Sequence, residues 1–340
     1  MTDLNTKLEI FDAIASRRNE RRNFLRFAGG SALAIGGATL LSACGSDDSD
    51  LAPTPTPGPA PVAALNDADV LNVALNLEYL EAQFYAFAAF GVGLNANMLT
   101  GIGTQGAVTG GAQVPFQDTV VREYAREIAI DEVAHVAFLR SALGSAAVAQ
   151  PAIDISVGTA AAPGAFTAAA RAAGVIGATG VFNPYADDNS FLLGAYIFED
   201  VGVSAYKGAA PLIANKTYLE AAAGILAAEA YHAGLIRTIL YRKGLQTPNP
   251  IPSLITAANQ ISDARDSLDG SSDDDQGITG SDPTISNIVP TDANGLAYSR
   301  SVAQVHNIVY LTPTAKIGGG FFPNGTNNRL DSLRTSGANA

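Results

Sequence analysis

The chain has 340 residues, with 20 Lys and Arg against 32 Asp and Glu, so its formal net charge is −12. This acidic balance argues against nucleic-acid binding, which needs clustered Lys and Arg to neutralise phosphates. A single cysteine rules out an intrachain disulfide and any cysteine-based zinc or iron–sulfur site.

Residues 1–43 have the order of an export signal. Arg21 and Arg22 form a twin-arginine pattern, and an apolar run rich in Gly and Ala follows and ends in small residues. The run is short and rich in glycine for a span of a bilayer core about 30 Å thick. The sequence therefore predicts export by the twin-arginine machinery to the periplasm or cell envelope, rather than a transmembrane anchor.

The one cysteine, Cys44, closes a Leu-Ser-Ala-Cys sequence at the end of this signal. That sequence resembles the lipobox at which bacterial lipoproteins are cleaved and lipidated, although ordinary cleavage near Ala43 stays open. Residues 44–62 are acidic and then carry alternating prolines, which favour extended polyproline II. We expect a stalk that attaches the rest of the chain to a membrane through a lipidated Cys44.

Four long stretches then show the helical spacing of apolar residues: 66–90, 116–143, 188–213 and 215–244. Asn66 or Asp67 can cap the first helix, and basic residues followed by Gly244 suit the end of the fourth. The second and third stretches are separated by a long connection with several prolines and one short helical piece at 165–173. The sequence predicts an all-α, four-helix bundle with one long crossover over residues 63–245.

The composition changes in residues 246–340, which we expect to form a partly irregular C-terminal extension. Prolines break its start, and the acidic, Ser-rich run 263–275 is expected to be a solvated loop without the spacing of an EF-hand. A short helix is expected near 298–310, and the Gly-rich stretch 318–325 is expected to be an irregular cover. His306, the third histidine, is expected to have a structural or solvent-facing role.

The other two histidines each close a Glu-x-x-His pair, Glu132 with His135 and Glu229 with His232. Residues three apart in a helix share a face, so each pair directs one carboxylate and one imidazole at the same place. One such pair is a weak signal because both residue types are common on exposed faces. Two pairs on separate helices of a bundle indicate a two-metal carboxylate site.

The first and third helices repeat a second pattern. Glu78 lies seven residues before Tyr85, and Glu199 lies seven residues before Tyr206, a spacing that returns each helix to nearly the same face. The chain therefore consists of two helix pairs, each offering a Glu and then a Glu-x-x-His. Both tyrosines are expected either to hydrogen-bond near the metal ligands or to pack in the core.

The repeat also separates two neighbouring carboxylates of the first helix. Glu78 and Glu81 lie three residues apart, and the counterpart of Glu81 in the third helix is Gly202. Glu78 is therefore the symmetric choice for a ligand, and Glu81 is expected to be a neighbouring carboxylate or a surface residue.

The stretch 71–85, LNVALNLEYLEAQFY, resembles the ferritin-like superfamily of di-iron carboxylate proteins, and within it the exported family that includes plant desiccation-related proteins. The resemblance covers about residues 65–244 and a Phe-Phe-Pro-Asn-Gly sequence that ends at Gly325. It implies a ferritin-like bundle and these six metal ligands: Glu78, Glu132, His135, Glu199, Glu229 and His232. It also implies that Glu132 and Glu229 bridge the metals, while Glu78 and Glu199 are terminal, each with one histidine.

The residue types of this ligand set suit two iron or two manganese ions. Four carboxylates offset two divalent cations, and imidazole nitrogen favours iron or manganese over magnesium. Each histidine is expected to donate its other ring nitrogen to a nearby acceptor, with Asp131, Glu81 and Asp200 as candidates.

Two functions of different classes stay open from the sequence. The first is an oxidoreductase that reacts with peroxide or dioxygen in ferroxidase, peroxidase or catalase-like chemistry. The second is a non-enzymatic envelope stress or desiccation-related scaffold with a vestigial or structural metal site. The stalk and the C-terminal extension disfavour a hollow storage shell, and the sequence leaves homo-oligomers of other kinds open.

Overall fold

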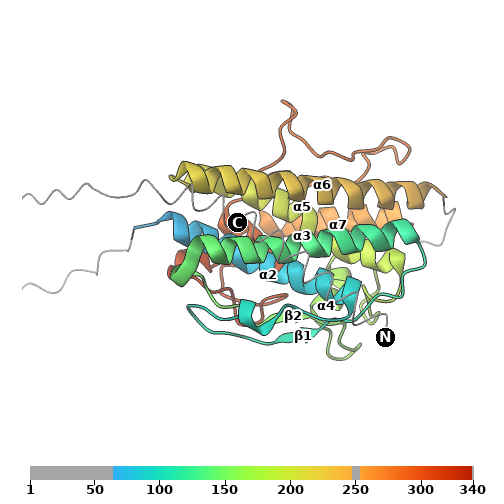
Figure 1. Cartoon of the computed structure of the whole chain (residues 1–340). Helices are drawn as coiled ribbons and strands as arrows, with labels where there is room; N and C mark the ends of the chain where they lie inside the picture. Colours follow the sequence, from blue (N-terminus) through green and yellow to red (C-terminus); the bar gives the residue numbers. More distant parts are fainter. Residues whose placement is uncertain (1–63, 247–252, 339–340) are drawn as a thin grey trace, which may run out of the picture. The chain divides into compact units, whose positions relative to one another are not determined.

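Four long helices form the bundle that the sequence predicts (Figure 1): α2 Asp67–Phe90, α3 Thr119–Leu143, α5 Asp188–Ala209 and α6 Lys216–Gln246. The structure is a computed structural model that describes residues 64–246 and 253–338. The expected export signal, Cys44 and the stalk lie outside these residues. Helix α2 packs most extensively on α3, and α5 packs most extensively on α6, which confirms the two helix pairs.

Three of the expected helix boundaries differ in the structure. Helix α5 ends at Ala209 instead of residue 213, and a 3₁₀ turn that contains Pro211 follows it. Helix α3 begins three residues later than expected, because the Asp118 side chain caps it by accepting from the N–H groups of Val120 and Val121. Helix α6 runs through Gly244 instead of ending there. A Cβ at Gly244 would lie 2.6 Å from Cγ1 of Ile255, so this glycine permits close approach of the following helix.

The connections between the bundle helices contain a two-stranded parallel sheet. Strand β1 Val108–Gly110, in the α2–α3 connection, pairs in parallel with β2 Ile153–Ile155 of the long crossover. The crossover also contains the expected short helix, α4 Ala165–Ala172. The short 3₁₀ turns are η1 Ala96–Met98, η2 Gly144–Ala146, η3 Ala210–Leu212 and η4 Asp331–Leu333.

The C-terminal extension is more ordered than the sequence suggested. Helix α7 Leu254–Asp269 includes half of the run 263–275, so the prediction of a solvated loop is wrong there. The error has a physical cause, since Asp269 and Asp275 are buried and both pair with Arg300, which lies later in the sequence. The short helix expected near 298–310 is α8 Val302–Val309.

The expected irregular cover around 318–325 inserts two aromatic rings into the bundle. Phe321 and Phe322 are fully buried, and the Phe321 ring packs edge-on against Phe166 and Phe198 at centroid distances of 5.2 and 4.9 Å. Each such burial stabilises the fold by about 1.5–3 kcal/mol. Within the described part of the chain, we find no helix long and apolar enough to cross a membrane.

Candidate metal centre

The structure brings all six expected ligands together in the middle of the bundle. Glu78 comes from α2, Glu132 and His135 from α3, Glu199 from α5, and Glu229 and His232 from α6, and all six are buried. One atom from each of Glu78, Glu132, His135 and Glu229 lies within 4.8 Å of the others, and so do atoms of Glu199, Glu229 and His232. These two groups, which share Glu229, are called the Glu/His cluster below.

Each half of the cluster centres on the Nδ1 atom of a histidine. His135 Nδ1 lies 3.2 Å from Glu78 Oε2 and 3.8 Å from Glu229 Oε1. His232 Nδ1 lies 3.7 Å from Glu199 Oε2. The ring centroids of the two histidines are 6.2 Å apart, so the two halves are adjacent.

Glu132 lies between the two histidines. Its Oε2 is 3.5 Å from His135 Nδ1, and its Oε1 is 3.1 Å from His232 Nδ1. Glu229 contributes an oxygen to both groups. This placement fits the bridging roles that the resemblance implies for Glu132 and Glu229, with Glu78 and Glu199 each beside one histidine.

The cluster forms few hydrogen bonds, although all six of its residues are buried. Among the described residues, most buried side-chain N and O atoms without a hydrogen-bond partner belong to it: both carboxylate oxygens of Glu132 and Glu229, Oε2 of Glu78 and Glu199, and Nδ1 of His135 and His232. Buried polar atoms normally have partners, because an unpaired one costs the desolvation energy of the group. Carboxylate oxygens and imidazole nitrogens directed at one place are a donor set for divalent cations.

Burial and mutual charge perturb the ionisation of the cluster. Burial raises the pKa of Glu78 to about 7 and the pKa of Glu199 to about 8. Burial would lower the pKa of His135, but Glu78 and Glu132 outweigh it and raise that pKa to about 11. The pKa of Glu132 is lowered, because both histidines outweigh the effect of burial. Without a metal, the cluster therefore retains protons that a bound cation would displace.

Two tyrosines connect the two helix pairs. Tyr85 of α2 donates its hydroxyl hydrogen to Glu199 of α5, and Tyr206 of α5 donates to Glu78 of α2. Both side chains are also buried in the core, so each of the two roles left open by the sequence is present. Each tyrosine hydrogen-bonds to the glutamate of the opposite half, which holds that carboxylate in position.

The acidic neighbours of the cluster differ in what they contact. Asp131 Oδ2 lies 3.5 Å from Nε2 of His232, which fits the expected role of Asp131 as the partner of a histidine. Asp200 binds the guanidinium groups of Arg237 and Arg265 instead, so the expectation that it supports a histidine is wrong. Sequence reasoning missed these two buried arginines. Only Arg237 carried a signal, as a charged residue among the apolar neighbours of α6, whereas Arg265 stands among polar residues.

Glu81 is a buried neighbour of the cluster rather than a surface residue. Burial raises the pKa of Glu81 well above its ordinary value, and the neighbouring carboxylates of Glu132 and Glu199 add to the effect. Its counterpart, Gly202, leaves room for another side chain, since a Cβ there would lie 2.3 Å from Glu229 Oε2. The departure from exact repetition at Glu81 and Gly202 therefore makes space for Glu229.

His306 is buried elsewhere, in α8, and is no member of the cluster. Its Nε2 lies 3.0 Å from the hydroxyl of Thr326, and burial lowers its pKa to about 4. A neutral, hydrogen-bonded imidazole in the core fits the structural role expected from the sequence.

Comparison with known proteins supports the four-helix fold, and the matched family domain contains the buried Glu/His cluster. The family described as the ferritin-like domain matches residues 66–242, a range that contains the four bundle helices up to Arg242 and the whole cluster. The chain is 27% identical over 271 residues to "Ferritin-like catalase Nec2" of Nesocodon mauritianus, covering 78% of this chain and 84% of that protein. It is 29% identical over 243 residues to "Desiccation-related protein PCC13-62" of Craterostigma plantagineum, covering 69% of this chain and 75% of that protein.

These matches confirm the resemblance to the ferritin-like superfamily and to the family that includes desiccation-related proteins. The fold and the buried Glu/His cluster together fit a ferritin-like metal-binding protein with a two-metal site.

Proposed function

The chain belongs to the ferritin-like domain family, and from that premise we propose that its Glu/His cluster binds two iron or two manganese ions for redox chemistry with peroxide or dioxygen. The observation that carries the proposal is the convergence of four glutamates and two histidines, most of whose buried oxygen and nitrogen atoms lack hydrogen-bond partners. Bound ions of this kind supply the redox couple and the Lewis acidity that such chemistry needs.

Among the reactions considered, catalase-like disproportionation has the most support. It turns two molecules of hydrogen peroxide into one of dioxygen and two of water. One relative is named a ferritin-like catalase, and its similarity extends over most of both chains. Ferroxidase and peroxidase chemistry use the same donor set and stay open within the proposal.

The residues of the chain have separable tasks in this proposal. Glu132 and Glu229 would bridge the ions, and Glu78 with His135 and Glu199 with His232 would each complete one side. Tyr85 and Tyr206 hold the two terminal carboxylates through hydrogen bonds, and Asp131 orients the ring of His232. Deep burial excludes bulk water from the reacting atoms.

Elemental analysis of the protein purified without chelators tests this proposal. We expect about two iron or manganese ions per chain, and oxygen release on addition of hydrogen peroxide. Replacing His232→Ala should abolish metal binding while far-ultraviolet circular dichroism keeps its helical signal. Tyr231→Ala is the matched control, because the neighbouring Tyr231 is 76% exposed. A His232→Ala protein with full metal content would refute the ligand assignment.

A non-enzymatic, desiccation-related scaffold remains the second candidate. The observation that favours it is the similarity to a protein named desiccation-related. If the chain takes up no iron or manganese, even on anaerobic reconstitution with ferrous or manganous ions, this second candidate replaces the first.

We also propose that the chain is exported and lipidated. Arg21 and Arg22 would direct it to the twin-arginine machinery, and Cys44 would carry the lipid that attaches it to a membrane of the cell envelope. Replacing both arginines with lysine should keep the protein in the cytoplasm, and Cys44→Ser should abolish incorporation of labelled fatty acid. Normal export and labelling in these variants would refute the proposal.

A further inference from the structure

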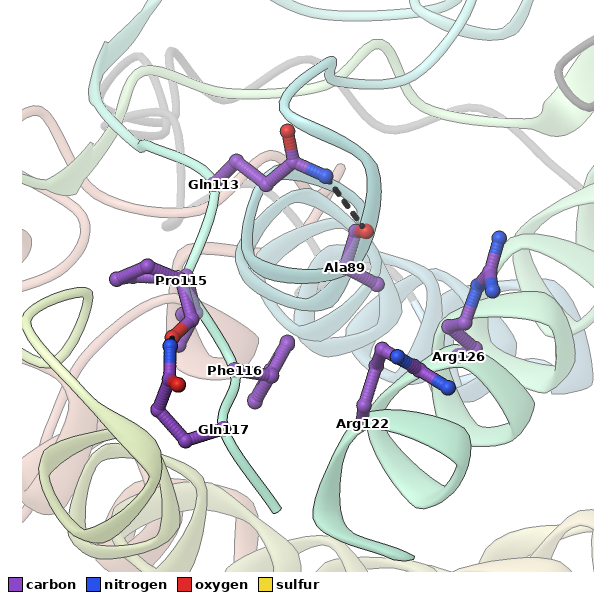
Figure 2. Close-up of a pocket in the computed structure, with 8 residues that line it drawn as sticks. Ala89, Gln113, Pro115, Phe116, Gln117, Arg122 and Arg126 are labelled. Atoms are coloured by element: carbon purple, nitrogen blue, oxygen red, sulfur yellow. Dashed lines mark hydrogen bonds between the residues drawn. The ribbon is translucent and has the colours of Figure 1, made fainter. Parts of the chain in front are cut away.

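A cavity of about 460 Å³ lies where α2 ends and α3 begins, and none of its lining residues belongs to the Glu/His cluster. Figure 2 shows the loop residues Gln113, Pro115 and Gln117 on one side, and Arg122 and Arg126 of α3 on the other. The Phe116 side chain lies between them. The volume falls in the range typical of small-molecule sites, about 300–1,000 Å³.

The charge of the cavity favours an anion. Arg122 and Arg126 lie four residues apart, so they project from the same face of α3. Both are near one carboxylate, since Glu123 Oε1 is 2.9 Å from Arg122 Nε and 3.8 Å from Arg126 Nη1. As far as the described residues go, no carboxylate lines the cavity itself. Two arginines therefore line the cavity, in a chain whose net charge is −12.

These arginines remain available to a ligand. The side chains of Arg122 and Glu123 are 46% and 58% exposed, and exposed ion pairs of this kind contribute only about 0.2–1 kcal/mol. An incoming carboxylate that accepts from a guanidinium fork makes a stronger, charge-assisted pair. The amides of Gln113 and Gln117 add neutral polar groups at the rim.

The remaining lining is apolar and suits a flat ring. Val114, Pro115 and Phe116 form one side of the cavity together with Ala89 from the end of α2. Arg126 also lies over the Phe90 ring, 5.8 Å from its centroid, so its guanidinium is already placed for contact with π-systems. An apolar floor beneath two cations fits a molecule with an aromatic body and a carboxylate.

A chain of aromatic contacts connects this floor with the Glu/His cluster. The Phe116 ring packs edge-on against Phe191 at 5.1 Å, and Phe191 packs edge-on against Tyr85 at 5.8 Å. Tyr85 in turn donates its hydroxyl hydrogen to Glu199. A ring bound on Phe116 would therefore be in continuous contact with a side chain that touches the cluster.

We propose that this cavity binds a phenolic carboxylate that serves as the reducing cosubstrate of the Glu/His cluster. The inference rests on the proposed redox function and identifies a substrate class for its peroxidase form. In the overall reaction, two phenols each lose one electron and one proton and become phenoxyl radicals. One hydrogen peroxide takes up both electrons and both protons and becomes two waters.

Binding to the full chain in its metal-free form is the first test, because it does not depend on activity. Calorimetric titration with 4-hydroxybenzoate should show saturable binding. Arg122→Gln and Arg126→Gln should each weaken that binding about tenfold, as expected for loss of one charge-assisted hydrogen bond. Lys216→Gln, which removes one exposed positive charge outside the cavity, is the matched control and should bind like the parent. Absence of saturable binding, or equal losses in all three variants, would overturn the proposal.

The second test uses the metal-loaded protein and hydrogen peroxide. We expect oxidation of 4-hydroxybenzoate with a lower KM than that of p-cresol, which lacks the carboxylate, and Arg122→Gln should raise the KM for the acid. Phe191→Leu should lower kcat for the phenol while its KM stays the same, because Phe191 does not line the cavity. Binding without any oxidation, in a protein that consumes peroxide, would overturn the cosubstrate role. A protein that binds the acid but holds no metal would instead refute the proposed redox function.

Discussion

Two buried polar clusters lie side by side along α5, and adjacent residues of that helix belong to different ones. Glu199 belongs to the Glu/His cluster, whereas Asp200 belongs to an arginine–aspartate network between the bundle and the C-terminal extension. The network has equal numbers of acids and bases: Asp200, Asp269 and Asp275 with Arg237, Arg265 and Arg300. The cluster has an excess of carboxylates over imidazoles.

The two clusters also differ in how completely their atoms are bonded. In the network, Asp275 accepts from Arg265 at 2.8 Å, from Arg300 at 2.9 Å and from Ser262 at 2.5 Å. The unpartnered network atoms among the described residues are two guanidinium Nε atoms and one oxygen of Asp269. A buried cluster that satisfies its own charges supports the fold, whereas one that leaves its acceptors unpaired is suited to bind a cation.

The largest effect on stability should come from breaking the network. Asp275→Ala leaves Arg265 and Arg300 buried without their shared partner, and loss of one member of a buried ion pair costs about 3–5 kcal/mol. Urea unfolding should show this decrease in the free energy of unfolding. Asp273→Ala, two residues away and exposed, is the control and should change stability little. A small loss for Asp275→Ala would contradict the view that the network is structural.

The Glu/His cluster should make the metal-free protein less stable as pH rises. The pKa of Glu78 is raised from 4.5 to about 7 and that of Glu199 to about 8, so the folded chain holds protons that the unfolded chain releases. The free energy of unfolding should therefore fall between about pH 4.5 and about pH 8. The raised pKa values of His135, about 11, and His232, about 10, act in the same direction above their ordinary value of 6.5.

Urea unfolding at about pH 5 and about pH 8, with and without metal, measures this dependence. Bound cations displace the protons, so the loss of stability with pH should be smaller or reversed in the metal-loaded protein. Equal pH dependence in the two forms would show that the cluster does not bind metal through these groups.

Gly202 is the position at which the third helix departs from the repeat, since its counterpart in the first helix is Glu81. Gly202→Ala places a Cβ 2.3 Å from Glu229 Oε2, so the carboxylate must move, and metal affinity should fall about 10–100-fold. Gly224→Ala is the matched control, because its new Cβ meets nothing within 4 Å in the middle of α6. That control should gain about 0.5–1 kcal/mol of stability and keep its metal. Competition with a chromogenic chelator measures both affinities.

The difference between the two clusters also explains which parts of the site could be predicted from the sequence. The Glu/His cluster is readable because each ligand is fixed by spacing within one helix and by its counterpart in the repeat, as for Glu78 and Glu199. Helical spacing places such residues on a face, and the bundle then brings the faces together. The same logic predicted the four long helices.

The arginine–aspartate network could not be predicted in this way. Its bonds join residues far apart in the sequence, such as Arg237 with Asp200 and Arg300 with Asp275, and no repeat or spacing relates them. An acidic, Ser-rich run has the composition of a solvated loop, and only its distant partners make burial favourable. For the same reason, the spacing predicted that Tyr85 shares a helix face with Glu78, but it did not reveal that Tyr85 hydrogen-bonds to Glu199 of another helix.

The smallest change in stability is expected when one tyrosine hydroxyl is removed. This change tests whether the two halves of the cluster are equivalent. Tyr85→Phe and Tyr206→Phe each remove one buried hydrogen bond to a glutamate and keep the ring, so each should lower the free energy of unfolding by about 0.5–1.5 kcal/mol. Metal content should be retained, since neither hydroxyl is a ligand in the proposed site. Tyr231→Phe, at a position 76% exposed, is the control and should change nothing. Because the two bonds are reciprocal across the repeat, clearly unequal losses would show that the two halves hold their terminal glutamates differently.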